Sequence, residues 1–232
     1  MLTVAGPNAA GKSTLLRLIT RAIRPSGGSI SVFGNDIAHM PLRQIAKTIS
    51  FVPQIHKPMF PFTVFEMVLA GRNPHLGELK QPGKADEDKA LAAVALTGIS
   101  DIAGRPYTKI SGGQLQLVLI ARAIAQEAPV MLLDEPSSHL DIRNQIGILK
   151  TIDRIRDEHE LCIISVLHDI NLSLAFSDRL IFLKNGKKTA EGNPGDIVTA
   201  EMVKEVYGVE TAVLKDGENT YVAPHLKNNE KK

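Results

Sequence analysis

The stretch GPNAAGKST, Gly6 to Thr14, has the G-x-x-x-x-G-K-[ST] spacing of a phosphate-binding loop, and we call it the phosphate loop. Backbone N–H groups in such a loop point into a concavity that holds phosphate oxygens, and the following helix adds its positive end. The Lys12 ammonium would reach the β- and γ-phosphates, and the Ser13 hydroxyl would bind Mg²⁺. A chance glycine-rich turn would also match, but the apolar run before the loop and the helical pattern after it favour a nucleotide site. The predicted phosphate contacts are Gly6, Asn8, Ala9, Ala10, Gly11, Lys12, Ser13 and Thr14.

A second candidate lies where the apolar run VMLLD, 130–134, ends in two adjacent carboxylates. A carboxylate at the end of a buried strand is costly unless it meets a cation or a hydrogen-bond donor. Asp134 is suited to bind Mg²⁺, usually through water, and Glu135 is suited to act as the general base that polarises the attacking water. Alone, this pair is more typical of a helix-capping turn; together with the phosphate loop, it favours the chemical role.

A third candidate is SGGQ, Ser111 to Gln114, which opens a helical run and which we call the signature loop. Ser111 is a natural N-cap, and Gly112 and Gly113 leave backbone N–H groups open to an anion. That anion can be the γ-phosphate of a nucleotide held by another molecule.

A phosphate loop, SGGQ and a strand ending in Asp-Glu, in this order, resemble the ATP-binding cassette of ABC transporters. The resemblance implies an α/β fold with a P-loop NTPase (RecA-like) core, an inserted helical subdomain, ATPase activity, and ATP and Mg²⁺ as cofactors. It also implies roles for Gln54, which in the family contacts Mg²⁺ and senses the transporter subunit, and for His168, which contacts the γ-phosphate. By themselves, Gln54 would be a surface polar residue and His168 part of the scaffold. The segment SSHLD, 137–141, matches the loop through which two cassettes touch.

The resemblance further implies a homodimer that sandwiches two ATP molecules, with the signature loop of one chain completing the site of the other. Integral-membrane permease subunits and, indirectly, a substrate-binding protein would be its partners, with the chain peripheral on the cytoplasmic face of the cell membrane. Three flanking stretches, 62–77, 168–180 and 201–210, resemble ATPases of importers for ferric siderophores, haem and cobalamin. Which cargo is carried stays open, and so does a cassette that binds nucleotide with little turnover.

Other classes fit less well. DNA-repair and chromosome ATPases separate the phosphate loop from the signature by a long coiled coil, and no sustained heptads lie between Lys12 and Ser111. Translation-factor ATPases carry two cassettes, whereas this chain has one set of motifs. His56 and His75 suggest a metal site only weakly, because both are predicted to lie in loops and an importer's ATPase need not touch the cargo.

Two positions depart from the family pattern. Glycine is usual where Ala9 stands, so its methyl group would either crowd the loop or require a negative φ. Leu117 stands where a basic residue is usual, which leaves a contact on the helix surface in doubt.

The composition of the chain limits the classes of protein to which it can belong. The chain has 232 residues, 44% of them hydrophobic, and a formal net charge of +2, so no broad nucleic-acid-binding face is expected. The single cysteine, Cys162, lies in an apolar run and is predicted to be a buried, inert thiol. No run approaches the length of about 20 apolar residues that a membrane span needs, and no signal peptide is evident, so we expect a cytosolic chain.

Alternating strand and helix patterns predict α/β structure with a largely parallel sheet. We expect three parts: 1–55, the first part of the core; 56–128, the helical subdomain with the signature; and 129–232, the second part with a hairpin and a helix. The expected strands are 2–5, 29–33, 48–52, 130–134 and 161–167, with hairpins at Asn185-Gly186 and Asp216-Gly217. The expected helices are 13–23, 63–70, 85–96, 115–126, 144–156 and 200–207, and the tail 228–232 is expected to fray.

The short start of the chain carries one more expectation. Cassettes of this family begin with antiparallel strands that supply an aromatic residue to stack on adenine, and such strands need about 20–30 residues. Only Met1 to Ala5 precede the phosphate loop, and no aromatic residue precedes Phe33. We therefore expect these strands to be missing, most simply because of a start codon placed too late, and 29–33 to present an unpaired edge.

Overall fold

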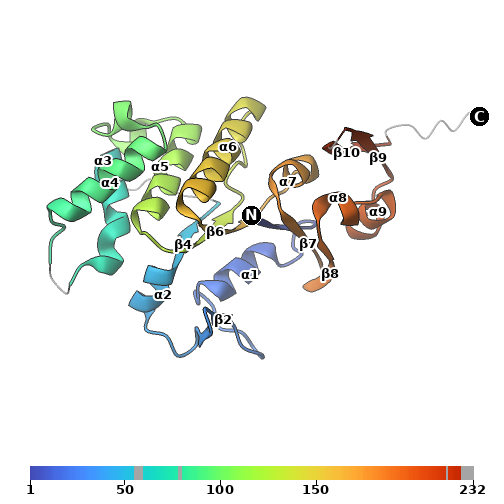
Figure 1. The fold of residues 1–232 in the computed structure, drawn as a ribbon, viewed down its shortest axis with the longest axis horizontal. Coiled ribbons are helices and arrows are strands. Elements are labelled where there is room, and N and C mark those ends of the chain that lie inside the picture. The colour runs from blue at the N-terminus through green and yellow to red at the C-terminus, as the bar shows by residue number, and fades with distance from the viewer. Residues whose placement is uncertain (55–59, 78–79, 218, 226–232) are drawn as a thin grey trace, which may run out of the picture. The chain divides into compact units, whose positions relative to one another are not determined.

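The computed structural model describes residues 1–54, 60–77, 80–217 and 219–225, and it divides into two compact units (Figure 1). The first unit joins Met1–Leu15 to Ile164–Lys232, and the second is Leu16–Ile163. The borders fall inside helix α1 (Lys12–Ile19) and strand β6 (Cys162–Val166). The predicted division into three parts remains a prediction, and His56 and the tail 228–232 lie outside the described residues.

The first unit is built on strand β1 (Leu2–Ala5), which pairs in parallel with β6 on one side and with β7 on the other. Strand β7 then forms an antiparallel hairpin with β8 through the predicted Asn185-Gly186 turn. A buried apolar cluster that includes Phe182, Val203 and Val206 joins these strands to the helices. The remaining elements are β7 (Arg179–Lys184), β8 (Lys187–Gly192), α7 (Ile170–Phe176), α8 (Pro194–Ile197), α9 (Ala200–Tyr207), β9 (Thr211–Asp216) and β10 (Asn219–Pro224).

The second unit contains the parallel pair β4–β5 and a group of helices. All five residues of β5 are buried, as its uninterrupted apolar sequence predicts. Helices α3, α4 and α5 pack together in one group (Figure 1) around a core that includes Val64, Val94 and Val118. The elements are β2 (Ser31–Val32), β3 (Asn35–Asp36), α2 (Leu42–Thr48), β4 (Ile49–Val52), α3 (Val64–Leu69), the 3₁₀ helix η1 (Ala70–His75), α4 (Lys84–Leu96), η2 (Ser100–Ile102), η3 (Tyr107–Lys109), α5 (Gly112–Ala125), β5 (Val130–Asp134) and α6 (Ile142–His159).

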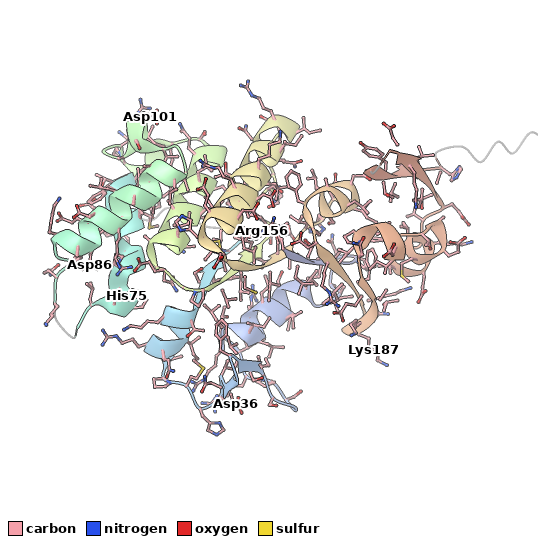
Figure 2. The ribbon with its side chains drawn as sticks, viewed as in Figure 1. Asp36, His75, Asp86, Asp101, Arg156 and Lys187 are labelled. Carbon is pink, nitrogen blue, oxygen red and sulfur yellow. The ribbon has the colours of Figure 1, made fainter. Side chains whose placement is uncertain are left out.

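A buried arginine ties the helical group together. Arg72 is 3% exposed, and its guanidinium bonds to the Asp86 carboxylate at 3.0 Å, to the Glu127 carboxylate at 2.7 Å and to the Ala125 carbonyl at 2.7 Å. Close by, His75 Nε2 is hydrogen-bonded to the Gln126 carbonyl at 2.8 Å, and Figure 2 shows His75 beside Asp86. The cluster joins η1 to the start of α4 and the end of α5, so it fixes segments that are distant in sequence.

The expected α/β class with parallel strands is confirmed in both units, but three local predictions need correction. Helix α1 ends at Ile19, before the proline and glycines, because Arg21 adopts φ 57° and the Ala22 N–H bonds to the Arg17 carbonyl at 2.9 Å, which closes the helix. The strand predicted over 29–33 is only Ser31–Val32, and it pairs with Asn35–Asp36.

The prediction for Cys162 is also wrong, because its side chain is exposed. It is the first residue of β6, and the neighbouring Ile163 takes the buried side of the strand. Alternation along a strand places adjacent side chains on opposite faces, so an apolar run does not bury every member. Among the described residues, no helix is long and apolar enough to cross a membrane.

Candidate functional site

The phosphate loop leaves the end of β1 and leads into α1, as predicted. The Lys12 side chain is 5% exposed and folds back across the loop, where its ammonium donates to the Gly6 carbonyl at 2.8 Å and the Pro7 carbonyl at 2.9 Å. Within the loop, the Ala10 N–H donates to the Pro7 carbonyl at 3.2 Å. The lysine that is predicted to meet phosphate oxygens is thus already directed at oxygen atoms of the loop.

Glycine is required at the first position of the loop by packing as well as by conformation. Gly6 has φ 148°, and a Cβ there would lie 2.1 Å from the Leu183 carbonyl oxygen of β7. Ala9, by contrast, is exposed and adopts φ 61°. The negative φ considered for Ala9 is therefore not what the structure shows: the alanine takes the left-handed conformation that glycine usually occupies.

His168 follows β6 at the same edge of the first unit's strands as the phosphate loop. Strands β1 and β6 run in parallel with Val4 opposite Val166, so the segments after them emerge on one side. His168 is exposed, and Asp169 after it caps α7 by accepting from the N–H groups of Asn171 and Leu172. The placement of His168 agrees with the predicted role near phosphate, which remains a prediction.

The predicted carboxylates gather with Gln54 in the second unit. Strands β4 and β5 are parallel with Val52 opposite Leu133, so Gln54 and the Asp134-Glu135 pair follow neighbouring strand ends. The Gln54 side-chain amide donates to the Glu135 carboxylate, a contact that the sequence did not predict. Asp134 is 4% exposed and Glu135 8%, and Glu135 has φ 52°. Such a buried carboxylate on a strained backbone is typical of a site where function sets the conformation.

The signature loop is held by a reciprocal cap at the start of α5. The Ser111 hydroxyl accepts from the Gln114 N–H at 3.3 Å, and the Gln114 side chain accepts from the Ser111 N–H at 3.0 Å. The predicted N-cap is confirmed, and Gln114 is its second member. Ser111 and Gly112 are exposed, so the N-terminal end of α5 is open to a partner.

The loop 137–141 positions the start of α6 beside the signature. Asp141 caps α6 by accepting from the Asn144 N–H and its side-chain amide, both at 2.8 Å, and Asn144 lies against Gly113. A cavity of about 420 Å³ between α5 and α6 is bordered by Ser111, Gly113, Gln114 and Asn144. Leu117 also lines this cavity, where the usual basic residue would bring a charge.

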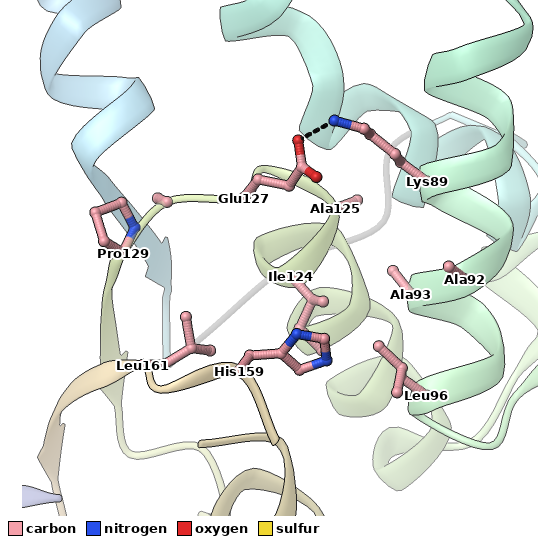
Figure 3. A pocket seen from close by; sticks show the side chains of 11 residues that line it. Lys89, Ala92, Ala93, Leu96, Ile124, Ala125, Glu127, Pro129, His159 and Leu161 are labelled. Carbon is pink, nitrogen blue, oxygen red and sulfur yellow. Dashed lines mark hydrogen bonds and ion pairs between the residues drawn. The ribbon is translucent and has the colours of Figure 1, made fainter. Parts of the chain in front are cut away.

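A further cavity, of about 380 Å³, lies between α4, the end of α5 and the end of α6 (Figure 3). Its wall is mainly aliphatic, from residues such as Leu96, Ile124 and Leu161, with the Lys89–Glu127 ion pair at its border. It contains none of the predicted site residues, so we do not assign the nucleotide to it.

The predicted residues thus fall into two groups, each assembled within its own unit. The phosphate loop and His168 belong to the first unit, and Gln54, the carboxylates and the signature loop belong to the second. Sequence reasoning missed Leu183 behind Gly6 and the Gln54–Glu135 bond, because both contacts join residues far apart in sequence.

Comparison with known proteins shows the family of this chain. The family model described as ABC transporter matches residues 1–138. The petrobactin import ATP-binding protein FpuC of Bacillus anthracis is 36% identical over 97% of this chain and 82% of its own. The hemin import ATP-binding protein HmuV of Gloeobacter violaceus is 40% identical over 93% of this chain and 80% of its own.

Solved structures give the same result. A protein described as a metal-chelate type ABC transporter in an inward-facing conformation superposes with a TM-score of 0.85 at 31% identity, covering 97% of this chain and 87% of that chain. The dimeric ATP-binding cassette MJ0796, in a post-hydrolysis state bound to ADP and Pi, superposes with a TM-score of 0.72 at 27% identity. That match covers 84% of this chain and 85% of the other.

Proposed function

This chain belongs to the ABC transporter family, and we propose that it is the ATP-hydrolysing subunit of an importer for ferric siderophore, haem or cobalamin. The observation that carries the hydrolytic role is the buried Glu135 carboxylate held by the Gln54 amide at the end of β5. A protein that only bound nucleotide would have no need for a buried carboxylate in a strained conformation beside a fixed amide donor.

The phosphate loop holds the nucleotide. Lys12 exchanges its carbonyl partners on Gly6 and Pro7 for oxygens of the β- and γ-phosphates. The buried ammonium therefore stays hydrogen-bonded before and after the nucleotide binds. Backbone N–H groups of the loop and the start of α1 supply the remaining donors. His168, at the same strand edge, contacts the γ-phosphate.

Three side chains would hold Mg²⁺ in the proposed function. The Ser13 hydroxyl, the Gln54 side-chain carbonyl and the Asp134 carboxylate all offer oxygen atoms, which a hard cation prefers as ligands. When bound, the ion neutralises charge on the β- and γ-phosphates.

Glu135 polarises the water that attacks the γ-phosphate. Its carboxylate accepts a proton from the water as the bond to phosphorus forms, and the Gln54 amide keeps the carboxylate oriented. Phosphoryl transfer needs positioning and charge neutralisation more than covalent chemistry, and the side chains described above provide both.

A second copy of the chain completes each site. The exposed N-terminal end of α5, with Ser111 to Gln114, presents N–H groups to the γ-phosphate bound by its partner. The dimeric form of the related cassette MJ0796 supports this assembly. Closure of the dimer then drives integral-membrane permease subunits, with the chain peripheral to the membrane and a substrate-binding protein delivering the cargo.

The nucleotide role is tested by Lys12→Ala, which removes the charge that meets the phosphates. We expect nucleotide binding, measured as the rise in Tm that ATP induces, to be lost. ATPase activity is expected to fall at least about 100-fold. The matched control is Lys150→Ala, which removes an exposed lysine of α6 and is expected to leave both unchanged. Retained ATPase activity in Lys12→Ala would refute the assignment of the phosphate loop.

The hydrolytic role is tested by Glu135→Gln, which keeps the shape of the side chain but cannot accept the proton. We expect ATP to bind without turnover and the protein to accumulate as an ATP-dependent dimer in size-exclusion chromatography. Glu158→Gln, at an exposed position of α6, is the matched control and is expected to hydrolyse ATP normally. Normal turnover by Glu135→Gln would exclude the carboxylate as the base, and a strictly monomeric variant with ATP bound would exclude the role of the signature loop.

A further inference from the structure

The turn of the β7–β8 hairpin lies directly against the phosphate loop. Asn185 and Gly186 have φ 50° and 73°, the backbone of a type I′ turn. In a two-residue turn the N–H of the second residue is not used by the strand ladder. Here the Gly186 N–H donates to the Ala10 carbonyl at 3.0 Å, in the middle of the phosphate loop.

At two further positions the backbone of the phosphate loop lies close to the backbone of the hairpin. A Cβ on Gly6 would collide with the Leu183 carbonyl oxygen at 2.1 Å, so the loop and β7 are in direct backbone contact. A Cβ on Gly11 would lie 3.7 Å from the Cα of Gly186. The first and the last glycine of the G-x-x-x-x-G spacing thus both face the same hairpin.

Helix α9 holds the hairpin in place. The Lys184 ammonium donates to the Glu205 carbonyl. Two residues before Lys184 on β7, the fully buried Phe182 ring packs edge-on against the Tyr207 ring, with centroids 6.2 Å apart and an interplanar angle of 87°. Burial raises the pKa of the Tyr207 phenol to about 12, so this ring stays neutral. The strand that leads into the turn is therefore held by two contacts with α9.

We propose that Gly186 is a positioning residue for nucleotide binding, because its N–H fixes the peptide plane between Ala10 and Gly11. In a planar trans peptide the carbonyl and the following N–H point in opposite directions. Holding the Ala10 oxygen toward the hairpin turns the Gly11 N–H to the other side, where phosphate binds. The Gly186 hydrogen bond thus keeps the phosphate loop in its nucleotide-binding conformation, although the neighbouring Ala9 has a strained backbone with φ 61°. The inference rests on the proposed function of the phosphate loop.

A matched pair of glycines provides the test. Gly186 and Gly217 both lie in hairpin turns with positive φ, 73° and 58°, and a Cβ on either meets no atom within 4 Å. Alanine at either position is strained by the positive φ, and of the two glycines Gly186 is the one that bonds to the loop. We expect Gly186→Ala to weaken binding of ATP and of inorganic triphosphate about fivefold each, whereas Gly217→Ala leaves both dissociation constants unchanged. Asparagine tolerates a positive φ, so Gly186→Asn is expected to restore most of the affinity.

A backbone ester removes the donor without changing the side chain. Because Cys162 is the only cysteine in the sequence, a synthetic segment 162–232 can be ligated to residues 1–161 to give the full chain. Glycolic acid at position 186 is expected to weaken ATP and triphosphate binding at least as much as Gly186→Ala does. Unchanged affinity in this ester, or equal effects of Gly186→Ala and Gly217→Ala, would overturn the inference while wild-type binding upheld the proposed function. A wild-type chain that binds neither nucleotide nor triphosphate would overturn both.

Discussion

Two glycines in different units touch a backbone carbonyl so closely that no side chain fits. A Cβ on Gly6 would lie 2.1 Å from the Leu183 oxygen, and a Cβ on Gly71 would lie 2.2 Å from the Arg122 oxygen. Gly6 belongs to a recognisable motif and has a positive φ, whereas Gly71 lies within η1 and has no motif around it. The same requirement arises once from a locally encoded loop and once from packing between distant segments.

The surroundings of the two glycines differ in the same way. The loop at Gly6 is held by backbone hydrogen bonds, from Ala10 to Pro7 and from Gly186 to Ala10. The region at Gly71 is held by a side chain, since the adjacent Arg72 ties three segments together. The first region is therefore sensitive to changes of backbone conformation, and the second to changes of charge and packing.

The largest effects are expected from alanine at the two glycines. Gly6→Ala and Gly71→Ala each force a methyl group into a carbonyl, so we expect each to lower the free energy of unfolding by about 3 kcal/mol. Only Gly6→Ala is expected to abolish nucleotide binding in the protein that remains folded. Urea unfolding and ATP titration at low temperature measure the two effects separately.

Gly27→Ala is the control for both, because a Cβ there meets no atom within 4 Å. It is expected to change neither stability nor affinity. Loss of ATP binding in a folded Gly71→Ala protein would show that the two regions are not independent in this respect.

Removing the charge of the second region is expected to have a smaller effect. Arg72→Met keeps most of the side-chain volume but leaves the Asp86 and Glu127 carboxylates without their shared partner. Breaking a fully buried pair costs about 3–5 kcal/mol, but these carboxylates are 19% and 44% exposed, so we expect a loss of about 2 kcal/mol after solvent screening. Arg143→Met, at an exposed arginine of α6, is the comparison and is expected to leave the urea midpoint unchanged. Equal urea midpoints for Arg72→Met and the wild type would contradict the role assigned to the cluster.

The same cluster predicts a dependence on pH. The hydrogen bond from Arg72 holds the pKa of the Asp86 carboxyl below its ordinary value, with a further contribution from the Gly83 N–H. A carboxyl whose pKa is lower in the folded state adds stability above its unfolded pKa of about 4, and that stability is lost as the pH falls through the folded pKa. We therefore expect the stability difference between the wild type and Asp86→Asn to be constant above about pH 5 and to shrink below pH 4. In an Arg72→Met background this shrinkage is expected to be smaller.

The difference between the two regions also explains which features could be predicted from the sequence. The phosphate loop, the buried strand 130–134, the Ser111 cap and the Asn185-Gly186 turn each depend on residues within a short window, and all four agree with the structure. Their chemistry is local: a spacing of glycines, an apolar run, a capping side chain or a pair of residues that accept a positive φ.

Features that depend on distant partners were not predicted. Arg72 gives no local sign that it is buried, because Asp86 and Glu127 become its partners only when α4 and α5 pack. Likewise, an arginine at position 21 gives no sign of a left-handed helix end, and its guanidinium is held by the carbonyls of Ile37 and Met40 after folding. The roles of Gln54 and His168 came from family resemblance, to which the Gln54–Glu135 bond adds a contact of this chain's own.

The smallest effect is expected from relieving the backbone strain at Ala9 in the phosphate loop, which changes stability but not nucleotide binding. Ala9 is exposed with φ 61°, a conformation that costs an L-residue about 1 kcal/mol or more, whereas glycine adopts it freely. Glycine also gains entropy in the unfolded chain, which offsets part of the relief, so we expect Ala9→Gly to raise the free energy of unfolding by about 0.5 kcal/mol. The neighbouring Asn8 is exposed without a positive φ, so Asn8→Gly carries only the entropic cost and is expected to lower stability by a similar amount. Opposite signs in parallel urea titrations would locate the strain at Ala9; a decrease of stability in both variants would show that Ala9 is not strained. Because the Gly186 N–H still holds the Ala10 carbonyl in both variants, ATP affinity is expected to change by less than about twofold.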